Sequence, residues 1–162
     1  MALKSITTRC AIAGGGPAGM MLGFLLARAG VDVLVLEKHP DFLRDFRGDT
    51  IHPSTLDVMA ELGLLDELLS LPHQKVSQLG VQVGASQLMI GDFSRLPTRC
   101  KFVAFMPQWD FLNLLARHAA RYPNFSLMMQ AKATGLIEEG GRVRGVRAKT
   151  PEGRIEIAAD LV

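Results

Sequence analysis

Three glycines near the start of the chain have the spacing of a phosphate-binding turn. They are Gly14, Gly16 and Gly19, within AGGGPAG, and they fit the pattern G-x-G-x-x-G. In this pattern the first glycine allows a sharp turn, the second lets the backbone approach a pyrophosphate, and the third lets a helix pack closely. Pro17 suits the first helical turn, where its missing N–H costs nothing. The N–H groups that follow, from Ala18 onward, would face a phosphate.

An acidic residue stands at the distance from these glycines where a ribose would bind. Glu37 follows Gly19 by 18 residues (37 − 19) and ends the apolar run at residues 31–36. A carboxylate in this position accepts hydrogen bonds from both hydroxyl groups of an adenosine ribose. Because no arginine replaces Glu37, a free 2′-hydroxyl is favoured. The spacing therefore predicts FAD or NAD at this site rather than NADP.

These residues must be positioned by a strand, a turn, a helix and a second strand. The sequence predicts strands at residues 9–13 and 31–36 with a helix between them, which is a dinucleotide-binding βαβ unit. Pro53 and Pro107 mark further helix starts, and residues 125–130 are predicted to return to the parallel sheet. A glycine-rich turn in an ordinary βαβ unit is one alternative. A secretory signal is another, although the glycines and the proline interrupt its apolar region.

The last segment departs from a plain Rossmann dehydrogenase. Residues 133–162 are predicted to form three strands joined by tight turns at residues 139–141 and 151–153. A helix would be the usual crossover at this point, so a β-meander favours a flavin-binding architecture. The chain stops at Leu161 and Val162 without a polar tail. We expect a C-terminally truncated protein whose apolar cut edge promotes association.

Composition argues against several other classes of protein. Of the 162 residues, 48% are hydrophobic and 21% charged, as in a soluble domain with one core. A net charge of +2 without a Lys/Arg block argues against a nucleic-acid partner, and no apolar run is long enough to cross a membrane. The two cysteines and four histidines lack metal-ligand spacing, so no metal site is expected. We expect a cytoplasmic protein.

Four segments together carry a family likeness: GGGPAG, LEKH, RGDTIHPSTLDVMAELGLLDEL and MPQWDFLNLLA. In these segments, and over nearly its whole length, the chain resembles the FAD-dependent aromatic hydroxylases. These are the group A flavoprotein monooxygenases typified by para-hydroxybenzoate hydroxylase. The resemblance implies an α/β fold with a Rossmann-like, glutathione reductase-like parallel sheet and a β-meander crossover. It assigns residues 1–74 and 107–162 to a partial FAD-binding domain and residues 75–106 to an inserted substrate-domain sheet.

The resemblance also implies roles for the residues that match the family's motifs. The glycine turn would hold the FAD pyrophosphate, and the residues that end the second strand would contact the adenosine end. An arginine loop would line the path to the flavin, and a glutamine at a helix start would bond the ribityl or phosphate region. In that order these residues are Gly14, Gly16, Pro17, Ala18 and Gly19; Glu37 and Lys38; Arg47 and Gly48, with Asp49 beside them; and Gln108.

The function implied by the resemblance is a monooxygenase in which NAD(P)H and O2 serve FAD-dependent hydroxylation of a small aromatic substrate. No nucleophile–base–acid arrangement is evident, so no catalytic residue is assigned, as expected where a cofactor carries the chemistry. We expect the isolated chain to be inactive, because the family's later Asp-Gly and Gly-Asp motifs are missing. An FAD-dependent dehydrogenase, reductase or halogenase on the same scaffold is an alternative, as is a truncated, non-catalytic nucleotide-binding module.

Overall fold

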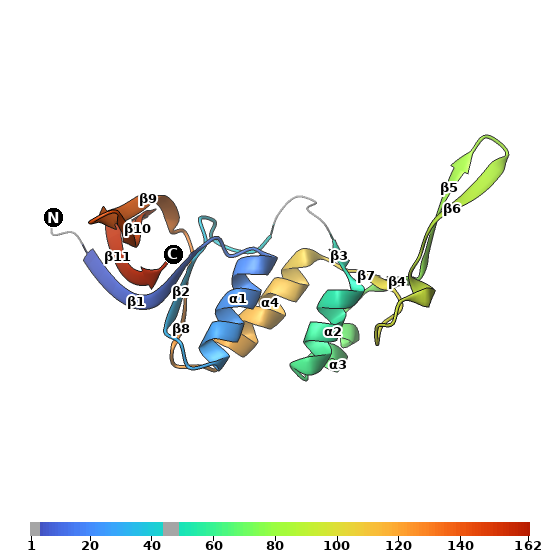
Figure 1. Cartoon of the computed structure of the whole chain (residues 1–162), viewed down its shortest axis with the longest axis horizontal. Helices are drawn as coiled ribbons and strands as arrows, with labels where there is room; N and C mark the ends of the chain where they lie inside the picture. The colour runs from blue at the N-terminus through green and yellow to red at the C-terminus, as the bar shows by residue number, and fades with distance from the viewer. Residues whose placement is uncertain (1–3, 44–48) are drawn as a thin grey trace. The chain divides into compact units, whose positions relative to one another are not determined.

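The computed structural model describes residues 4–43 and 49–162, which form two compact units. One unit combines the described residues up to Leu43 with those from Leu112 to the end of the chain. The other takes the described residues between them. Each unit is described by itself, and Figure 1 gives the labels of their helices and strands.

The first unit is built on a six-stranded sheet with the order β8-β2-β1-β11-β10-β9. Its strands are β1 (Lys4–Ala13), β2 (Val33–Leu36), β8 (Phe125–Met128), β9 (Lys132–Glu139), β10 (Arg142–Thr150) and β11 (Gly153–Leu161). Strand β1 pairs in parallel with β2 and β11, and β2 pairs in parallel with β8. The predicted parallel sheet is thereby confirmed.

Strand β1 is longer than the sequence predicted, because it serves two partners. Its second half, residues 10–13, pairs with β2, as expected of a βαβ unit. Its first half begins at Lys4 and pairs with β11, from Lys4 opposite Ile155 to Cys10 opposite Leu161. Residues 4–8 are polar except for Ile6 and carry little apolar signal of their own, so only the distant partner strand makes them part of the sheet.

Helix α1 (Pro17–Arg28) packs on one face of the parallel strands. A Cβ added to Gly23 would lie 2.7 Å from Cγ2 of Val35 and 3.1 Å from Cε2 of Phe125, so only a glycine allows this close approach. The end of the helix is tied to the start of β8 by Asn124, whose Nδ2 donates to the carbonyls of Ala27 at 2.9 Å and Val31 at 2.8 Å.

The meander formed by β9, β10 and β11 covers the opposite face. In β11 the side chains of Ile155 and Ile157 are buried, whereas the flanking Arg154 and Ala158 are exposed, which is the period of two of a half-buried strand. The inward side chains form one core cluster with residues of the parallel strands, namely Ala11, Leu34, Leu36, Ala131, Val146, Ala148, Ile155, Ile157 and Ala159. Figure 1 shows the three strands curling beside β1. The predicted β-meander crossover is confirmed.

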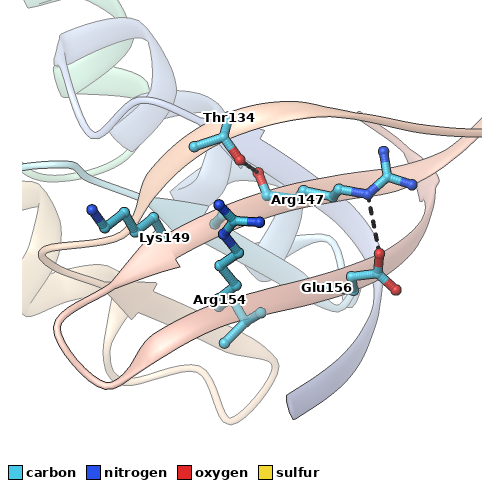
Figure 2. A pocket seen from close by; sticks show the side chains of 7 residues that line it. Thr134, Arg147, Lys149, Arg154 and Glu156 are labelled. Atoms are coloured by element: carbon cyan, nitrogen blue, oxygen red, sulfur yellow. Dashed lines mark hydrogen bonds and ion pairs between the residues drawn. The ribbon is translucent and has the colours of Figure 1, made fainter. Parts of the chain in front are cut away.

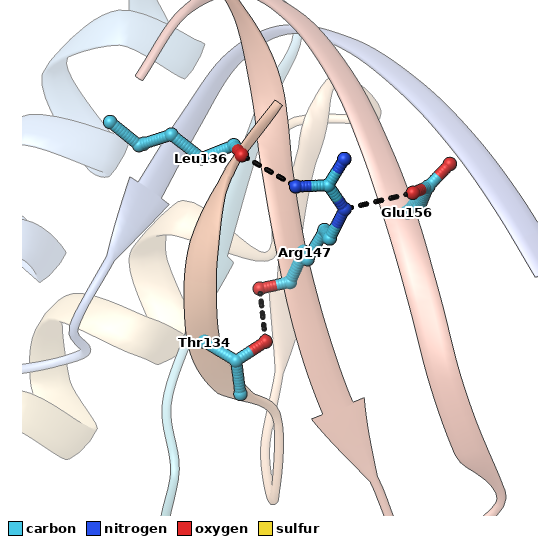
Figure 3. A network of polar contacts seen from close by, with 4 residues as sticks. All are labelled: Thr134, Leu136, Arg147 and Glu156. Atoms are coloured by element: carbon cyan, nitrogen blue, oxygen red, sulfur yellow. Dashed lines mark hydrogen bonds and ion pairs between the residues drawn. The ribbon is translucent and has the colours of Figure 1, made fainter. Parts of the chain in front are cut away.

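A polar network ties the meander strands together on their outer face (Figure 3). Arg147 of β10 donates from Nε to Oε1 of Glu156 on β11 at 3.1 Å and from Nη1 to the carbonyl of Leu136 on β9 at 2.8 Å. Thr134 of β9 donates its hydroxyl to the carbonyl of Arg147 at 3.2 Å. A single arginine thus contacts both neighbouring strands.

The second unit contains two small sheets and two short helices. Strands β3 (Thr50–Ile51), β7 (Val103–Phe105) and β4 (Gln74–Val76) form a three-stranded sheet, and β5 (Gln78–Val83) pairs with β6 (Ser86–Asp92) in a hairpin. The helices are α2 (Pro53–Glu61) and α3 (Leu65–Ser70), followed later by a 3₁₀ turn, η1 (Phe93–Arg95). Between residues 74 and 106 the structure has four strands, because Ser77 separates β4 from β5.

Helix α4 (Gln108–Ala119) begins one residue after Pro107, where the sequence placed its start. The predicted helix at Pro53 begins at that residue, and Gly63, just beyond its end, has a φ of +73°. Across the described parts of the chain, no helix has both the length and the apolar character needed to cross a membrane.

Candidate functional site

The glycine turn lies between the carboxyl end of β1 and the start of α1. Gly14 has a φ of +122°, a conformation that side chains rarely allow, and its N–H donates to the carbonyl of Leu36 at 2.8 Å. The sharp turn predicted at Gly14 is present. Because Leu36 closes β2, this hydrogen bond joins the ends of two neighbouring parallel strands, which is where such sheets bind ligands.

Gly16 and Gly19 lack side chains for different reasons. A Cβ on Gly19 would collide with the carbonyl oxygen of Gly14 and lie 3.2 Å from Cγ2 of Ile12, so the fold itself requires this glycine. The close packing predicted for Gly19 is therefore present, and its nearest neighbour is the backbone of the turn, followed by the Ile12 side chain of β1. Around Gly16, by contrast, an added Cβ would meet no described atom within 4 Å, and its φ of −74° suits any residue. This open space is where a ligand can approach the backbone.

The amino end of α1 presents the positive end of its helix dipole to this space. Pro17 is the first helical residue, as the sequence predicted, and Gly16 is the N-cap, which has no side chain to bond the first-turn N–H groups. No acidic residue occurs in the first turn. The N–H groups of Ala18 and Gly19 have no carbonyl partner within the helix, because the first turn of any helix lacks one. An anion fits this end better than a neutral group.

Glu37 is brought to the same turn from the end of β2. Its side chain is buried, and Oε2 accepts the N–H of Gly15 at 2.9 Å while Oε1 accepts the N–H of His39 at 3.0 Å. Its own N–H donates to the carbonyl of Met128 at 2.9 Å, and its carbonyl accepts the N–H of Ala131 at 2.8 Å. Each carboxylate oxygen has two lone pairs, so a carboxylate held in this way can also accept from ribose hydroxyls.

Two residues at this site were missed by sequence reasoning. Gly15 is the middle residue of GGG, and a Cβ there would lie 2.9 Å from the Cβ of Glu37, so the acid cannot approach unless this residue is glycine. The unbroken run of three glycines was the available signal. Gln130 has a left-handed φ of +55°, and its N–H donates to the carbonyl of His39 at 2.9 Å. No sequence pattern marks a glutamine for that conformation.

The remaining predicted residues are placed as follows. Lys38 is exposed beside Glu37, and its contact with the adenosine end stays a prediction. Gln108 begins α4 in the second unit, where its N–H donates to Oδ1 of Asp49 at 3.4 Å. The carbonyl of Asp49 accepts the N–H of Met106 at 2.9 Å, so Asp49 caps α4 from a distant part of the sequence. Arg47 and Gly48 lie outside the described residues.

The described titratable groups do not form a metal site or a reactive thiol. No group of three or more His, Cys, Asp or Glu residues among those described could hold a metal ion. Burial raises the pKa of the Cys10 thiol, and burial followed by the charge of Asp57 raises the pKa of the Cys100 thiol. Both cysteines are buried and unpaired by disulfides. Raised pKa values and burial make both thiols poor nucleophiles.

Known proteins share both the sequence pattern and the fold. The FAD binding domain family matches residues 7–162. The 6-methylpretetramide 4-monooxygenase of Streptomyces rimosus is 30% identical over 155 residues, covering 96% of this chain and 37% of that protein. The 3-(3-hydroxy-phenyl)propionate/3-hydroxycinnamic acid hydroxylase of Escherichia coli is 30% identical over 158 residues, covering 93% of this chain and 27% of that protein. The chain thus spans well under half the length of these relatives.

A solved structure gives the same fold. The p-nitrophenol 4-monooxygenase of Pseudomonas putida superposes with a TM-score of 0.81 at 22% identity, covering 98% of this chain and 40% of that one. At this identity the likeness shows the fold alone, and that fold is the α/β arrangement of parallel sheet and meander described above. With the family match over residues 7–162, the chain belongs to the FAD-binding domain family of the FAD-dependent aromatic hydroxylases.

Proposed function

We propose that this chain is the FAD-binding part of a flavoprotein monooxygenase that uses NAD(P)H and O2 to hydroxylate a small aromatic substrate. The family match supports the FAD-binding role. The names of the relatives, a 6-methylpretetramide 4-monooxygenase and a 3-(3-hydroxy-phenyl)propionate/3-hydroxycinnamic acid hydroxylase, support the reaction class.

The observation that carries the proposal is the open space over Gly16. It lies at the amino end of α1, where no side chain caps the helix and the first turn contains no acidic residue. The carboxylate of Glu37 reaches the same turn, where it accepts the N–H of Gly15, the residue before Gly16, as well as the N–H of His39. A dinucleotide needs a pyrophosphate site and a ribose acceptor at one sheet edge, and the described residues fit both requirements.

Each residue then has a separate task. The N–H groups of Ala18 and Gly19 bind the pyrophosphate, Gly14 shapes the turn, and Glu37 accepts from the adenosine ribose. When bound, FAD supplies the redox chemistry of oxygen transfer, and the protein supplies orientation and the exclusion of water. Lys38, Arg47, Gly48 and Gln108 are assigned to the same cofactor by the family resemblance.

The test is a pair of glycine substitutions at open positions. Gly16→Val fills the space proposed for the pyrophosphate, whereas Gly135→Val adds the same side chain in β9, where the Cβ likewise meets nothing within 4 Å. Both variants should fold, as measured by circular dichroism and thermal unfolding. Only Gly16→Val should weaken FAD binding, by about tenfold or more, since it blocks backbone contact with the phosphates.

Flavin fluorescence during titration with FAD gives the affinity, and visible absorbance after gel filtration shows whether the flavin is retained. A Gly16→Val variant that binds FAD as tightly as the unsubstituted chain would refute the proposed pyrophosphate position. A folded chain that binds no FAD would show that this part alone does not complete the cofactor site.

A second reaction on the same cofactor is halogenation. The FAD-dependent myxobacterial chondrochloren halogenase superposes on this chain with a TM-score of 0.80 at 24% identity, covering 95% of this chain and 36% of that one. The two reactions differ in what the enzyme consumes besides O2. Hydroxylation of an aromatic substrate without halide, coupled to NAD(P)H oxidation in the whole protein, supports the monooxygenase, and a strict requirement for chloride or bromide supports the halogenase.

We propose that residues 75–106 belong to the substrate domain of the whole protein. The β5–β6 hairpin supports this assignment, because two strands alone make a marginal structure and its apolar side chains are unusually exposed. The exposed fractions are 52% for Leu88, 57% for Met89 and 68% for Ile90. Turnover by the isolated chain would contradict the expectation that further parts of the protein are needed.

A further inference from the structure

Three basic residues lie directly opposite one another on the outer face of the meander. Lys149 of β10 is opposite Arg154 of β11 on one side and opposite Lys132 of β9 on the other. Side chains at directly opposed positions of antiparallel strands share one face, and all three residues are exposed. We call Lys132, Lys149 and Arg154 the cationic row.

The cationic row is unfavourable for the sheet by itself, because like charges at directly opposed positions destabilise a strand pair. The neighbouring position shows the favourable alternative, since Arg147 is opposite Glu156 and pairs with it at 3.1 Å. Within the part of the chain that the structure describes, none of the ion pairs involves a residue of the row. An anion from outside the chain would remove the repulsion.

A groove adjoins the row. It has a volume of about 430 Å³ and is lined by side chains from all three meander strands, among them Thr134, Arg147, Lys149, Arg154 and Glu156. Figure 2 shows Arg154 extending from β11, with Lys149 and Arg147 on either side of its guanidinium in this view. Small-molecule sites commonly enclose about 300–1,000 Å³, so the groove is large enough for a metabolite.

The extent of the row limits the kind of anion. Neighbouring strands are about 4.8 Å apart, so three strands span roughly 10 Å. The next outer-face pair, Arg147 with Glu156, is neutral, and the far end of β9 is acidic at Glu138 and Glu139. A nucleic acid needs a longer basic track than this, and the net charge of the whole chain is only +2.

We propose that the cationic row and its groove bind a small polyanion, a molecule that carries two or more phosphate or carboxylate groups within roughly 10 Å. Arg154 offers a planar fork of N–H donors to one such group, and the two lysine ammonium groups act as point charges on the other. Because the ligand removes the cross-strand repulsion only in the folded sheet, its binding stabilises the folded chain.

This site is separate from the glycine turn. The row lies near the amino end of β1, where Lys4 is opposite Ile155, whereas Gly14 follows the carboxyl end of that strand at Ala13. About nine residues of β1, or roughly 30 Å measured along the strand, separate the end near the cationic row from the end near Gly14. The chain would therefore bind FAD and a second anion independently.

The test is isothermal titration of the purified chain with inorganic pyrophosphate, and in a second arm with citrate, at low ionic strength. Lys149→Gln should weaken binding by about tenfold, the effect of losing one charge-assisted contact. Arg142→Gln is the matched control, because Arg142 is an exposed cation of the same strand opposite an acid, Glu139. It should change the affinity by less than about twofold, since salt screens distant charges.

The glycine-turn variant Gly16→Val separates this proposal from the proposed function. It should lose FAD binding yet bind pyrophosphate at the row unchanged. Binding of pyrophosphate alone would support a phosphate ligand, and binding of both probes would support any polyanion. No binding of either probe, equal losses in Lys149→Gln and Arg142→Gln, or loss of pyrophosphate binding in Gly16→Val would overturn the proposal.

A stability measurement gives a second readout. Without added anion, Lys149→Gln and Arg154→Gln should each unfold at a higher temperature than the unsubstituted chain, because each removes like-charge repulsion. Pyrophosphate at one concentration should stabilise the unsubstituted chain more than either variant, because each variant binds it more weakly. Variants that are less stable than the unsubstituted chain without added anion would contradict the unrelieved repulsion on which the proposal rests.

Discussion

The carboxylate of Glu37 accepts the N–H of Gly15 at 2.9 Å, although 22 residues separate them in the sequence. The acid that the sequence marks as a ribose acceptor therefore also holds the glycine turn against the end of β2. Gly15 makes this contact possible, because any side chain there would crowd the Cβ of Glu37. The fold and the proposed cofactor site share these two residues, so changes at either should affect both stability and FAD binding.

Replacing Glu37 by glutamine should lower both quantities. The amide keeps one acceptor oxygen and turns an NH2 group toward one of the two N–H donors, Gly15 or His39. Loss of one charge-assisted hydrogen bond should reduce the free energy of unfolding by about 2 kcal/mol and weaken FAD binding. Urea unfolding and FAD titration measure the two effects. Glu138→Gln, at an exposed position on β9, should change neither. An unaltered unfolding curve for Glu37→Gln would show that the Gly15 contact contributes no stability.

Removing the side chain of Asn124 should loosen the junction between α1 and β8. Its Nδ2 donates to two carbonyls, those of Ala27 and Val31, and no other side chain in the described structure replaces it. Asn124→Ala should therefore cost about 1–3 kcal/mol in the free energy of unfolding. Asn113→Ala, on the exposed side of α4, is the control and should be neutral or slightly stabilising. Equal stabilities of the two variants in urea would contradict this role.

The meander should tolerate alanine at Gly135 but not at Gly145. A Cβ on Gly145 would collide with the carbonyl oxygen of Ile157 on the neighbouring strand, whereas a Cβ on Gly135 would meet nothing within 4 Å. The backbone of β10 cannot move without disturbing its ladder, so Gly145→Ala should cost about 2 kcal/mol or more. Thermal unfolding of the two variants measures the difference. A Gly145→Ala variant as stable as Gly135→Ala would contradict the close contact between Gly145 of β10 and the carbonyl of Ile157 on β11.

The buried thiols should make the protein less stable at alkaline pH. Burial raises the pKa of Cys10 and of Cys100 in the folded chain. Below the unfolded-state pKa, about 8.5, both thiols are protonated in the folded and the unfolded state, and their contribution to the free energy of unfolding is fully present. Above it the unfolded state releases protons first, so stability falls as the pH rises through the folded-state pKa. Between pH 7 and 10 the free energy of unfolding should therefore fall less in the Cys10→Ala, Cys100→Ala double variant than in the unsubstituted chain. Parallel pH profiles would contradict the linkage.

Local patterns determined the βαβ unit and the predicted ligand site. The spacing of Gly14, Gly16 and Gly19, the proline at the first position of α1, and Glu37 at the end of β2 all act within a few turns of chain. The tight turns of the meander are equally local, because Gly140 and Gly141 adopt φ values of +58° and +74°. Short-range periodicity and turn chemistry suffice for such elements. The structure confirms the βαβ unit and the turns, and ligand binding at this site stays a prediction.

Tertiary structure alone decided the contacts between residues far apart in the sequence. The start of β1 at Lys4 depends on pairing with β11, the cap on α4 comes from Asp49, and the function of Gly15 depends on the approach of Glu37. The cationic row likewise arises from the register of three strands, which places Lys132 and Arg154 on either side of Lys149. A single sequence records which residues can pair, but the register that aligns them is set by long-range packing, because a shift of one residue would turn every side chain to the opposite face.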